Sequence, residues 1–335
     1  MTADDNKIGV IGAGSWGTAL AIQLARAGQQ PMLWGMEPEV IRSLTEERCN
    51  SVFLPDIPLP DSVTINADLD DVVRRNRDIL IVVPSHVFRQ VLEQIRPNLQ
   101  KGARIAWATK GFELASGKLP HQVARETLGI EVPLAVVSGP TFAKEVGLGL
   151  PTAMTVAATN TDYADELAWR FSGKNFRAYT SGDMVGVEVG GAVKNILAIA
   201  TGMSDGLGFG ANTRVALITR GLAEMTRLGM ALGAKTETFS GLSGMGDLVL
   251  TCTDDQSRNR RMGLALAAGK TVEETCEEIG QVVEGVKAAA AVRKVAHDLN
   301  VEMPICEQAY QILYEGASPE DAVGALMMRE VKSEG

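Results

Sequence analysis

The sequence IGVIGAGSWGTAL, residues 8–20, decides the fold. Residues 8–11 are an apolar run that predicts a short buried strand, and a helix is expected from Thr18 onward. Between them, Gly12, Gly14 and Gly17 form a G-x-G-x-x-G turn, whose glycines permit a tight turn, close approach of a pyrophosphate, and close packing of helix on strand. The N–H groups at the helix start can bind the phosphates. A purely structural glycine turn is the alternative, but this placement between strand and helix favours dinucleotide binding.

Length and composition indicate an ordered protein with two domains. The chain has 335 residues, of which 45% are hydrophobic and 22% charged. That length exceeds what one hydrophobic core usually serves, and the composition is typical of a globular protein. The net charge of -9 argues against non-specific nucleic-acid binding. We find no signal-peptide pattern and no apolar run of membrane-spanning length, so we expect a cytoplasmic enzyme without a membrane span.

The cysteines and histidines do not predict a metal site. No C-x-x-C pair occurs among the four cysteines, Cys49, Cys252, Cys276 and Cys306. This pattern favours reduced thiols over disulfides or a zinc centre. The three histidines also lie far apart in the sequence. We therefore expect no bound metal. The sequence also offers few histidines for a proton shuttle.

The first half of the chain alternates apolar strands with helical patterns. This alternation predicts a doubly wound α/β sheet of the Rossmann type, with parallel strands covered by helices. Besides 8–11, strands are expected at residues 31–34, 79–83, 103–108, 134–137, 152–158 and 176–179. Residues 48–62 hold three prolines and are expected to form a loop.

Two of these strands end at residues that bear on ligand binding. Lys110 follows the strand at 103–108 and is well placed to meet an anion, although a surface lysine in a turn is an equally good interpretation. Gly35 and Met36 follow the strand at 31–34, where an NAD-selective site usually has an acidic residue. The choice between NAD and NADP therefore stays open.

From Asp183 onward, helical patterns replace the strands. A helix is expected at 185–203, and further helices at 211–232, 257–268, 271–278, 284–299, 304–315 and 318–327. The fold class is thus an α/β N-terminal domain followed by an all-α C-terminal domain. We place a dinucleotide-binding domain at residues 1–185 and a helical substrate and catalytic domain at 186–335.

Lys194 and Asp247 are the first candidates for chemistry in the second half. Lys194 lies inside the apolar helix at 185–203. A desolvated lysine can serve as a general acid or base, although solvated lysines are the commoner case. Asp247 follows a glycine-rich stretch and is either a helix cap or the residue that orients the lysine.

Two further stretches of the second half suggest ligand contacts. Residues 257–261, SRNRR, place cation and amide donors near an expected helix start, which suits a phosphate. A solvated basic helix face is the alternative. Glu284 either approaches the cofactor or is an ordinary acidic residue at a helix N-terminus.

Long motifs along nearly the whole chain resemble the family of bacterial NAD(P)-dependent glycerol-3-phosphate dehydrogenases. They are GAGSWGTALA at 12–21, ATKGFE at 108–113, SGPTFAKE at 138–145, EVGGAVKNILAIATG at 188–202, GLSGMGDLVLTC at 241–252, SRNR at 257–260 and VEG at 283–285. The resemblance implies reversible hydride transfer between NAD or NADP and C2 of dihydroxyacetone phosphate, giving sn-glycerol 3-phosphate for phospholipid synthesis. It also implies a homodimer.

The resemblance assigns roles to individual residues. It implies three catalytic residues: Lys194 as the acid/base, Asp247 as the carboxylate that positions it, and Lys110 as a second cation at the substrate. The residues expected at the substrate are Lys110, Gly139, Thr141, Lys194, Asn195, Asp247, Thr251, Ser257, Arg258 and Asn259. Those expected at the cofactor are Gly12, Gly14, Ser15, Trp16, Gly17, Met36, Lys110, Ala143, Arg258, Val282 and Glu284. Met36 stands where many relatives carry histidine or arginine, which argues against strong NADP selectivity.

Two other functions fit these residues less well. Another two-domain dehydrogenase, of the 6-phosphogluconate or 3-hydroxy acid type, also combines a cofactor domain with a lysine-bearing helix. A non-enzymatic nucleotide-binding sensor would bind the cofactor without turnover. The presence of Lys110, Lys194 and Asp247 together favours an enzyme.

Overall fold

The computed structural model describes residues 6–328 and 330, and these form two compact units. Unit 1 comprises Met1–Lys110 and Lys118–Glu188, and unit 2 comprises Gly111–Gly117 and Val189–Gly335, each within the described residues. The change from unit 1 to unit 2 after Glu188 falls inside a single helix, α8 (Met184–Gly206).

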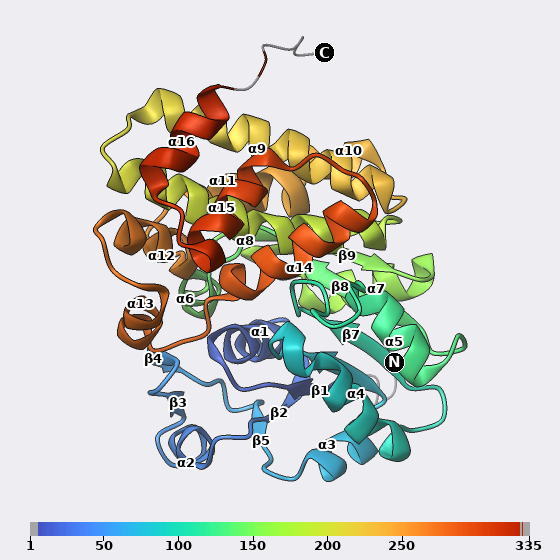
Figure 1. Ribbon diagram of the computed structural model, residues 1–335. Coiled ribbons are helices and arrows are strands. Elements are labelled where there is room, and N and C mark those ends of the chain that lie inside the picture. The colour runs from blue at the N-terminus through green and yellow to red at the C-terminus, as the bar shows by residue number, and fades with distance from the viewer. Residues whose placement is uncertain (1–5, 329, 331–335) are drawn as a thin grey trace. The chain divides into compact units, whose positions relative to one another are not determined.

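Unit 1 is built around an eight-stranded sheet in the order β10-β9-β8-β7-β6-β1-β2-β5 (Figure 1). The strands are β1 (Lys7–Ile11), β2 (Gln30–Trp34), β5 (Thr64–Ile65), β6 (Asp78–Ile81), β7 (Arg104–Trp107), β8 (Leu134–Ser138), β9 (Thr152–Ala158) and β10 (Phe176–Ser181). The helices of this unit are α1 (Ser15–Arg26), α2 (Pro38–Glu46), α3 (Leu69–Arg75), α4 (Phe88–Ile95), α5 (Pro120–Leu128), α6 (Ala143–Leu148) and α7 (Thr161–Phe171). The predicted α/β class is confirmed.

Three details of unit 1 differ from the predictions. The sheet is not wholly parallel, because β9 pairs antiparallel with β8 while β10 is parallel to β9. The apolar pattern of β9 predicts burial but carries no information on strand direction. The proline-rich stretch is also not all loop: β3 (Cys49–Asn50) and β4 (Leu54–Pro58) pair antiparallel, and the prolines of β4 are exposed. Helix α1 starts at Ser15 rather than Thr18, so Gly17 is helical.

Unit 2 is helical throughout its described regular elements. After α8 come α9 (Ala211–Ala231), α10 (Thr236–Phe239), a π-helical turn (Leu242–Gly246), α11 (Asp247–Thr253), α12 (Arg258–Ala267), α13 (Val272–Ile279), α14 (Glu284–Asp298), α15 (Pro304–Glu315) and α16 (Pro319–Met327). The predicted all-α character of this part is confirmed. The sequence pattern missed α10, the π-helical turn and α11, which are all short, and the π-helical turn contains two glycines.

Helix α8 is long and apolar enough to cross a membrane, although no such segment was expected from the sequence. Among the described helices it alone meets the criterion of length and composition. However, 83% of its apolar 18-residue stretch is buried inside the protein. A core helix has these properties, so they are weak evidence for a span.

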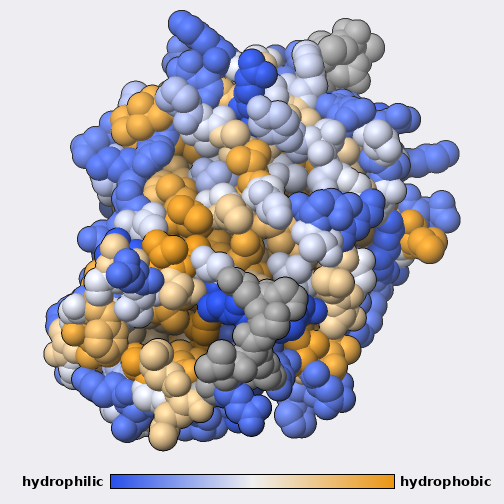
Figure 2. Space-filling view, turned by 90° about the horizontal axis from the view of Figure 1, so that it is seen from above, coloured by the Kyte–Doolittle hydropathy of each residue, from blue (hydrophilic) through white to orange (hydrophobic). Residues whose placement is uncertain are grey.

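Several large hydrophobic side chains remain exposed. Figure 2 shows hydrophobic side chains gathered near the middle of the face it presents, with hydrophilic ones around them. In unit 2 the exposed ones include Val215 and Met230 on α9 and Met327 on α16. Exposed apolar side chains of this kind can contribute to an interface.

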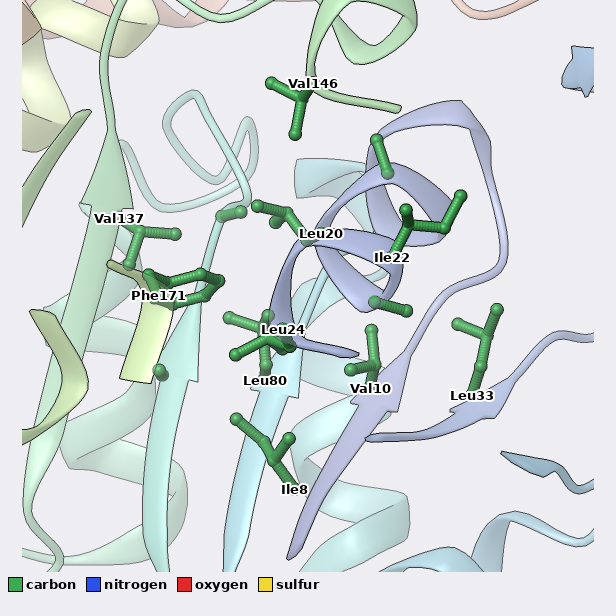
Figure 3. Close-up of a cluster of buried hydrophobic side chains, with 14 of the residues drawn as sticks. Ile8, Val10, Leu20, Ile22, Leu24, Leu33, Leu80, Val137, Val146 and Phe171 are labelled. Atoms are coloured by element: carbon green, nitrogen blue, oxygen red, sulfur yellow. The ribbon is translucent and has the colours of Figure 1, made fainter. Parts of the chain in front are cut away.

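The core of unit 1 holds α1 against the sheet (Figure 3). Leu20 and Leu24 on α1 are fully buried in one cluster with Val10 on β1 and Leu80 on β6. Full burial of an aliphatic side chain contributes about 1.5–3 kcal/mol. Because this packing fixes both α1 and β1, it also fixes the glycine turn that connects them.

Candidate functional site

The glycine turn between β1 and α1 needs two of its glycines for the backbone and leaves space beside the third. Gly12 has a φ of +116°, and a Cβ there would lie 2.2 Å from the carbonyl oxygen of Val82. A Cβ on Gly17 would lie 1.8 Å from the carbonyl oxygen of Gly12. A Cβ on Gly14 would meet no atom within 4 Å. The turn is therefore closed by Gly12 and Gly17 and open to a ligand beside Gly14.

The start of α1 offers hydrogen-bond donors next to this open space. Gly14 is the N-cap residue, and no side chain caps the helix. The indole Nε1 of Trp16 is buried and has no hydrogen-bond partner. Ser15 is the first residue of α1 and lies beside these donors. Open N–H groups at a helix N-terminus suit a pyrophosphate, so these residues fit a nicotinamide dinucleotide.

Asn50 stabilises the same turn from a distant part of the chain. Its side-chain amide donates to the carbonyl oxygen of Ala13 and to Oγ1 of Thr18, both at 2.8 Å. Asn50 is fully buried. Asn50 was not predicted, because it lies in the proline-rich stretch and belongs to no recognised motif.

Other predicted residues lie at the same edge of the unit 1 sheet as the glycine turn. Strands β1, β6, β7 and β8 are parallel neighbours, so their carboxyl ends share one edge. Lys110 follows β7, where Thr109 donates to the carbonyl oxygen of Val83 at 2.7 Å. Gly139 follows β8 with a φ of +152°, and Thr141 donates to its carbonyl oxygen at 3.2 Å. Ligands of doubly wound sheets bind at this edge.

The remaining predicted cofactor contacts of unit 1 lie at two element boundaries. Ala143 is the first residue of α6. Met36 follows β2 and has 74% of its surface exposed. An exposed methionine provides neither a carboxylate for a ribose hydroxyl nor a cation for a 2′-phosphate.

In unit 2, α8 and α11 bring Lys194 and Asp247 together. Lys194 is 7% exposed and Asp247 is 1% exposed. The Lys194 ammonium donates to Oδ1 of Asp247 at 2.5 Å and to Oγ1 of Thr251 at 3.0 Å. The Thr251 hydroxyl donates in turn to the carbonyl oxygen of Asp247 at 2.5 Å. A buried cation is thus held by a buried carboxylate and an oriented hydroxyl.

Glycines permit the close approach that this group requires. A Cβ on Gly190 of α8 would lie 2.3 Å from the carbonyl oxygen of Ser243 in the π-helical turn. Asp247 begins α11 directly after that turn, and no side chain caps this helix. The helix-cap interpretation of Asp247 therefore does not apply, and its carboxylate faces the lysine instead.

Asn195 and Asn259 form a second buried pair in unit 2. The side-chain amide of Asn259 donates to Oδ1 of Asn195 at 2.9 Å. Oδ1 of Asn259 accepts the backbone N–H of Gly285 at 2.8 Å. The pair therefore links α8, α12 and the start of α14.

Arg258 and Glu284 lie near one another at the starts of α12 and α14. Arg258 donates to Oε1 of Gln281 at 3.1 Å, and burial lowers its pKa. Burial raises the pKa of Glu284 to about 7, against the attraction of Arg258 and Lys287. Val282, beside them in sequence, is 41% exposed.

Two other residues of the basic stretch, Ser257 and Arg260, have structural partners. Ser257 is the N-cap residue of α12, and its hydroxyl oxygen accepts the N–H of Arg260 at 3.2 Å. Arg260 forms ion pairs with Asp205 and with Asp255. The guanidinium of Arg260 is therefore occupied by carboxylates of the protein itself. Arg258 is the better candidate for binding an anionic ligand.

Family models describe nearly all of the chain. Residues 7–164 match the N-terminal part of the NAD-dependent glycerol-3-phosphate dehydrogenases, and residues 183–324 match the C-terminal part. The chain belongs to this family. The chain is 57% identical over 333 residues to a glycerol-3-phosphate dehydrogenase [NAD(P)+] of Aeromonas hydrophila, covering 99% of this chain and 100% of that protein. It is 56% identical over 335 residues to the protein of the same name from Escherichia coli, covering 100% and 99%.

Solved structures support the same membership. A glycerol-3-phosphate dehydrogenase from Coxiella burnetii has a TM-score of 0.94 and 47% identity, covering 97% of this chain and 99% of that one. A D-mandelate dehydrogenase has a TM-score of 0.63 at 14% identity, covering 95% and 99%, and shares the fold alone. The alternative of another two-domain dehydrogenase is therefore not favoured.

Proposed function

We propose that this family member interconverts dihydroxyacetone phosphate and sn-glycerol 3-phosphate, with Lys194 as the catalytic acid and base. The observation that carries this assignment is the buried ammonium of Lys194 held by Asp247 and Thr251. Within phospholipid synthesis, the reaction supplies the glycerol phosphate backbone.

Proton transfer in this reaction requires a donor at the ketone oxygen. NADH or NADPH, held at the glycine turn of Gly12, Gly14 and Gly17, would supply the hydride for C2 and would be oxidised to NAD+ or NADP+. Lys194 donates one proton from its ammonium to the carbonyl oxygen, so the ketone becomes an alcohol and the lysine becomes neutral. Before transfer, the ammonium charge stabilises the oxyanion that develops on that oxygen. In the oxidation direction, the neutral amine accepts the alcohol proton.

Asp247 and Thr251 orient this proton donor. The carboxylate of Asp247 keeps the buried lysine charged, because burial alone favours the neutral amine. The Thr251 proton is committed to the carbonyl oxygen of Asp247, so its oxygen accepts from Lys194. These two acceptors fix the position of the ammonium that we assign to the ketone oxygen.

The other polar residues bind and orient the substrate. The guanidinium of Arg258 suits the phosphate, since a planar fork can donate two hydrogen bonds to it. We assign supporting contacts to a group of cationic, polar and backbone donors, namely Lys110, Gly139, Thr141, Asn195, Ser257 and Asn259. Binding of the remote phosphate positions C2 for hydride transfer.

The cofactor is assigned to the glycine turn and its neighbours. Gly12, Gly14 and Gly17 shape the pyrophosphate site, with Ser15 and Trp16 beside it. We assign further contacts to Met36, Lys110, Ala143, Arg258, Val282 and Glu284. On this basis residues 1–185 are the dinucleotide-binding domain, and residues 186–335 are the substrate and catalytic domain.

The proposal also covers the cellular location and the oligomeric state of the protein. We assign the protein to the cytoplasm, supported by four free cysteines. We also propose a homodimer, supported by the exposed Met230 and Met327, which line a cavity of about 1290 Å³ in unit 2. Analytical ultracentrifugation of the purified chain tests this assembly, and a single species of monomer mass would contradict it.

Steady-state kinetics test the reaction itself. We expect oxidation of NADH or NADPH with dihydroxyacetone phosphate, and the ratio of the two kcat/KM values measures cofactor preference. The same assay with 3-hydroxy acids and 6-phosphogluconate in the oxidation direction tests the alternative. Turnover of those compounds without turnover of dihydroxyacetone phosphate would contradict the proposal.

A further inference from the structure

Glu188 is a buried carboxylate of unit 1 that no part of the proposed reaction uses. Its side chain is 1% exposed. Oε1 accepts the indole N–H of Trp107 at 3.1 Å and the backbone N–H of His121 at 2.9 Å. Oε2 contacts Nδ1 of His121 at 2.5 Å. One carboxylate therefore joins the end of β7, the start of α5 and the first turns of α8.

These partners flank the segment that carries Lys110. Trp107 is the last residue of β7, three residues before Lys110, and His121 is the second residue of α5. Between them, Gly111–Gly117 belongs to unit 2, while both flanks belong to unit 1. Glu188 is itself the last unit 1 residue on α8. The Glu188 carboxylate thus binds a residue on each side of the segment Gly111–Gly117, and Lys110 immediately precedes that segment.

The junction includes a core side chain, and its ionisable groups interact with one another. Trp107 is fully buried and packs edge-on against Phe88, with ring centroids 5.6 Å apart. Burial raises the pKa of Glu188, and its hydrogen bonds to His121 oppose that shift. The pKa of His121 is also raised, by its bond to Glu188, against burial and Arg125. Loss of the carboxylate would leave three donors without this acceptor, which is costly in a buried site.

We propose that Glu188 is a positioning residue for Lys110. The carboxylate acts through Trp107 and His121, and touches neither substrate nor cofactor. This inference rests on the proposed role of Lys110 at the substrate. A misplacement of a substrate-orienting cation by a fraction of an ångström to 1 Å lowers the rate without removing any reacting group.

The test is a double-mutant cycle between Glu188 and Lys110. In the wild-type background we expect E188A to lower kcat/KM for dihydroxyacetone phosphate by about tenfold or more. In the K110A background the same substitution should change kcat/KM by less than about twofold, because its target is gone. The conservative E188Q keeps a carbonyl acceptor, and should retain most of the activity that E188A loses.

Glu224 provides a matched control in unit 2. It is also a buried carboxylate, 2% exposed, and accepts the backbone N–H groups of Ile305 and Cys306 at 2.7 and 3.2 Å. Burial raises its pKa as it does that of Glu188. We expect E224A to lower the unfolding temperature without lowering kcat/KM per folded molecule. If E188A does not fold, W107F removes one donor only and replaces it in the cycle.

The outcomes separate this inference from the proposed function. Normal turnover by K110A would overturn the substrate role of Lys110, and this inference with it. A slow K110A beside a fully active E188A or W107F would overturn the inference alone. If E188A lowered kcat/KM by the same factor in the K110A background as in the wild type, Glu188 would act independently of Lys110. That result would also overturn the inference.

Discussion

Lys194 is a buried charged side chain, and its chemistry depends on its ion pair with Asp247. A lone ammonium in such a position tends to lose its proton, whereas the adjacent carboxylate of Asp247 favours the charged form. The second acceptor, Oγ1 of Thr251, further fixes the orientation of the ammonium. The chemistry of this site thus depends on the pair rather than on the lysine alone.

We expect D247N to lower kcat for ketone reduction by about tenfold to a hundredfold. The amide is close in size to the carboxylate but does not neutralise the ammonium, so the alkaline limb of the pH profile should move to lower pH. The control is D298N, which alters an exposed Lys294–Asp298 pair in the same unit. A D247N enzyme with wild-type kcat and an unchanged pH profile would contradict the assigned role.

The raised pKa of Glu284 predicts that one side chain makes the free energy of unfolding depend on pH. Its pKa is about 7 in the folded protein, above the ordinary value of 4.5. The folded state therefore binds more protons than the unfolded state between these values, and stability from this group is lost as the pH rises from about 4.5 to about 7. We expect E284Q to exceed the wild type in free energy of unfolding by about 1–3 kcal/mol near pH 8, and to match it near pH 4. Urea unfolding at both pH values measures the difference, and an equal difference at both would contradict the assignment.

In the turn between β1 and α1, some glycines are required for folding and another is placed for ligand binding. Gly12 and Gly17 are required by contacts of the backbone, whereas Gly14 borders open space. We expect G12A to destabilise the protein by roughly 3 kcal/mol, because its φ and its contact with Val82 both exclude a side chain.

The matched variant G14A should leave stability within about 0.5 kcal/mol of the wild type. Its methyl group would occupy the space proposed for the pyrophosphate, so we expect the Kd for NADH to rise by about tenfold or more. Thermal unfolding and fluorescence titration with NADH measure the two effects. Unchanged NADH affinity in G14A would place the pyrophosphate elsewhere.

The elements also show what a sequence pattern can and cannot predict. Apolar runs located the buried strands β6, β7 and β8, because burial on both faces leaves a continuous hydrophobic signal. They did not reveal the antiparallel direction of β9, since direction depends on the path of the connecting chain. The short β3–β4 pair was hidden by its prolines.

At the scale of the whole molecule, long-range contacts account for most of what the sequence pattern missed. The motifs marked Lys194 and Asp247 separately, but their ion pair joins positions 53 residues apart. Glu188 lies inside the quoted motif at 188–202, yet only the structure shows its bonds to Trp107 and His121. Asn50 has no local signal at all. Tertiary contacts decide which marked residues meet, and which unmarked residues support them.

The central claim is that Lys194 supplies the proton for ketone reduction, and steady-state turnover of K194A tests it most directly. Dihydroxyacetone phosphate reduction is followed by NADH oxidation, with NADH affinity measured separately and K294A as an exposed-lysine control. We expect K194A to lose about a hundredfold or more in kcat while binding NADH normally, and K294A to match the wild type. Near-normal kcat in K194A would contradict the account.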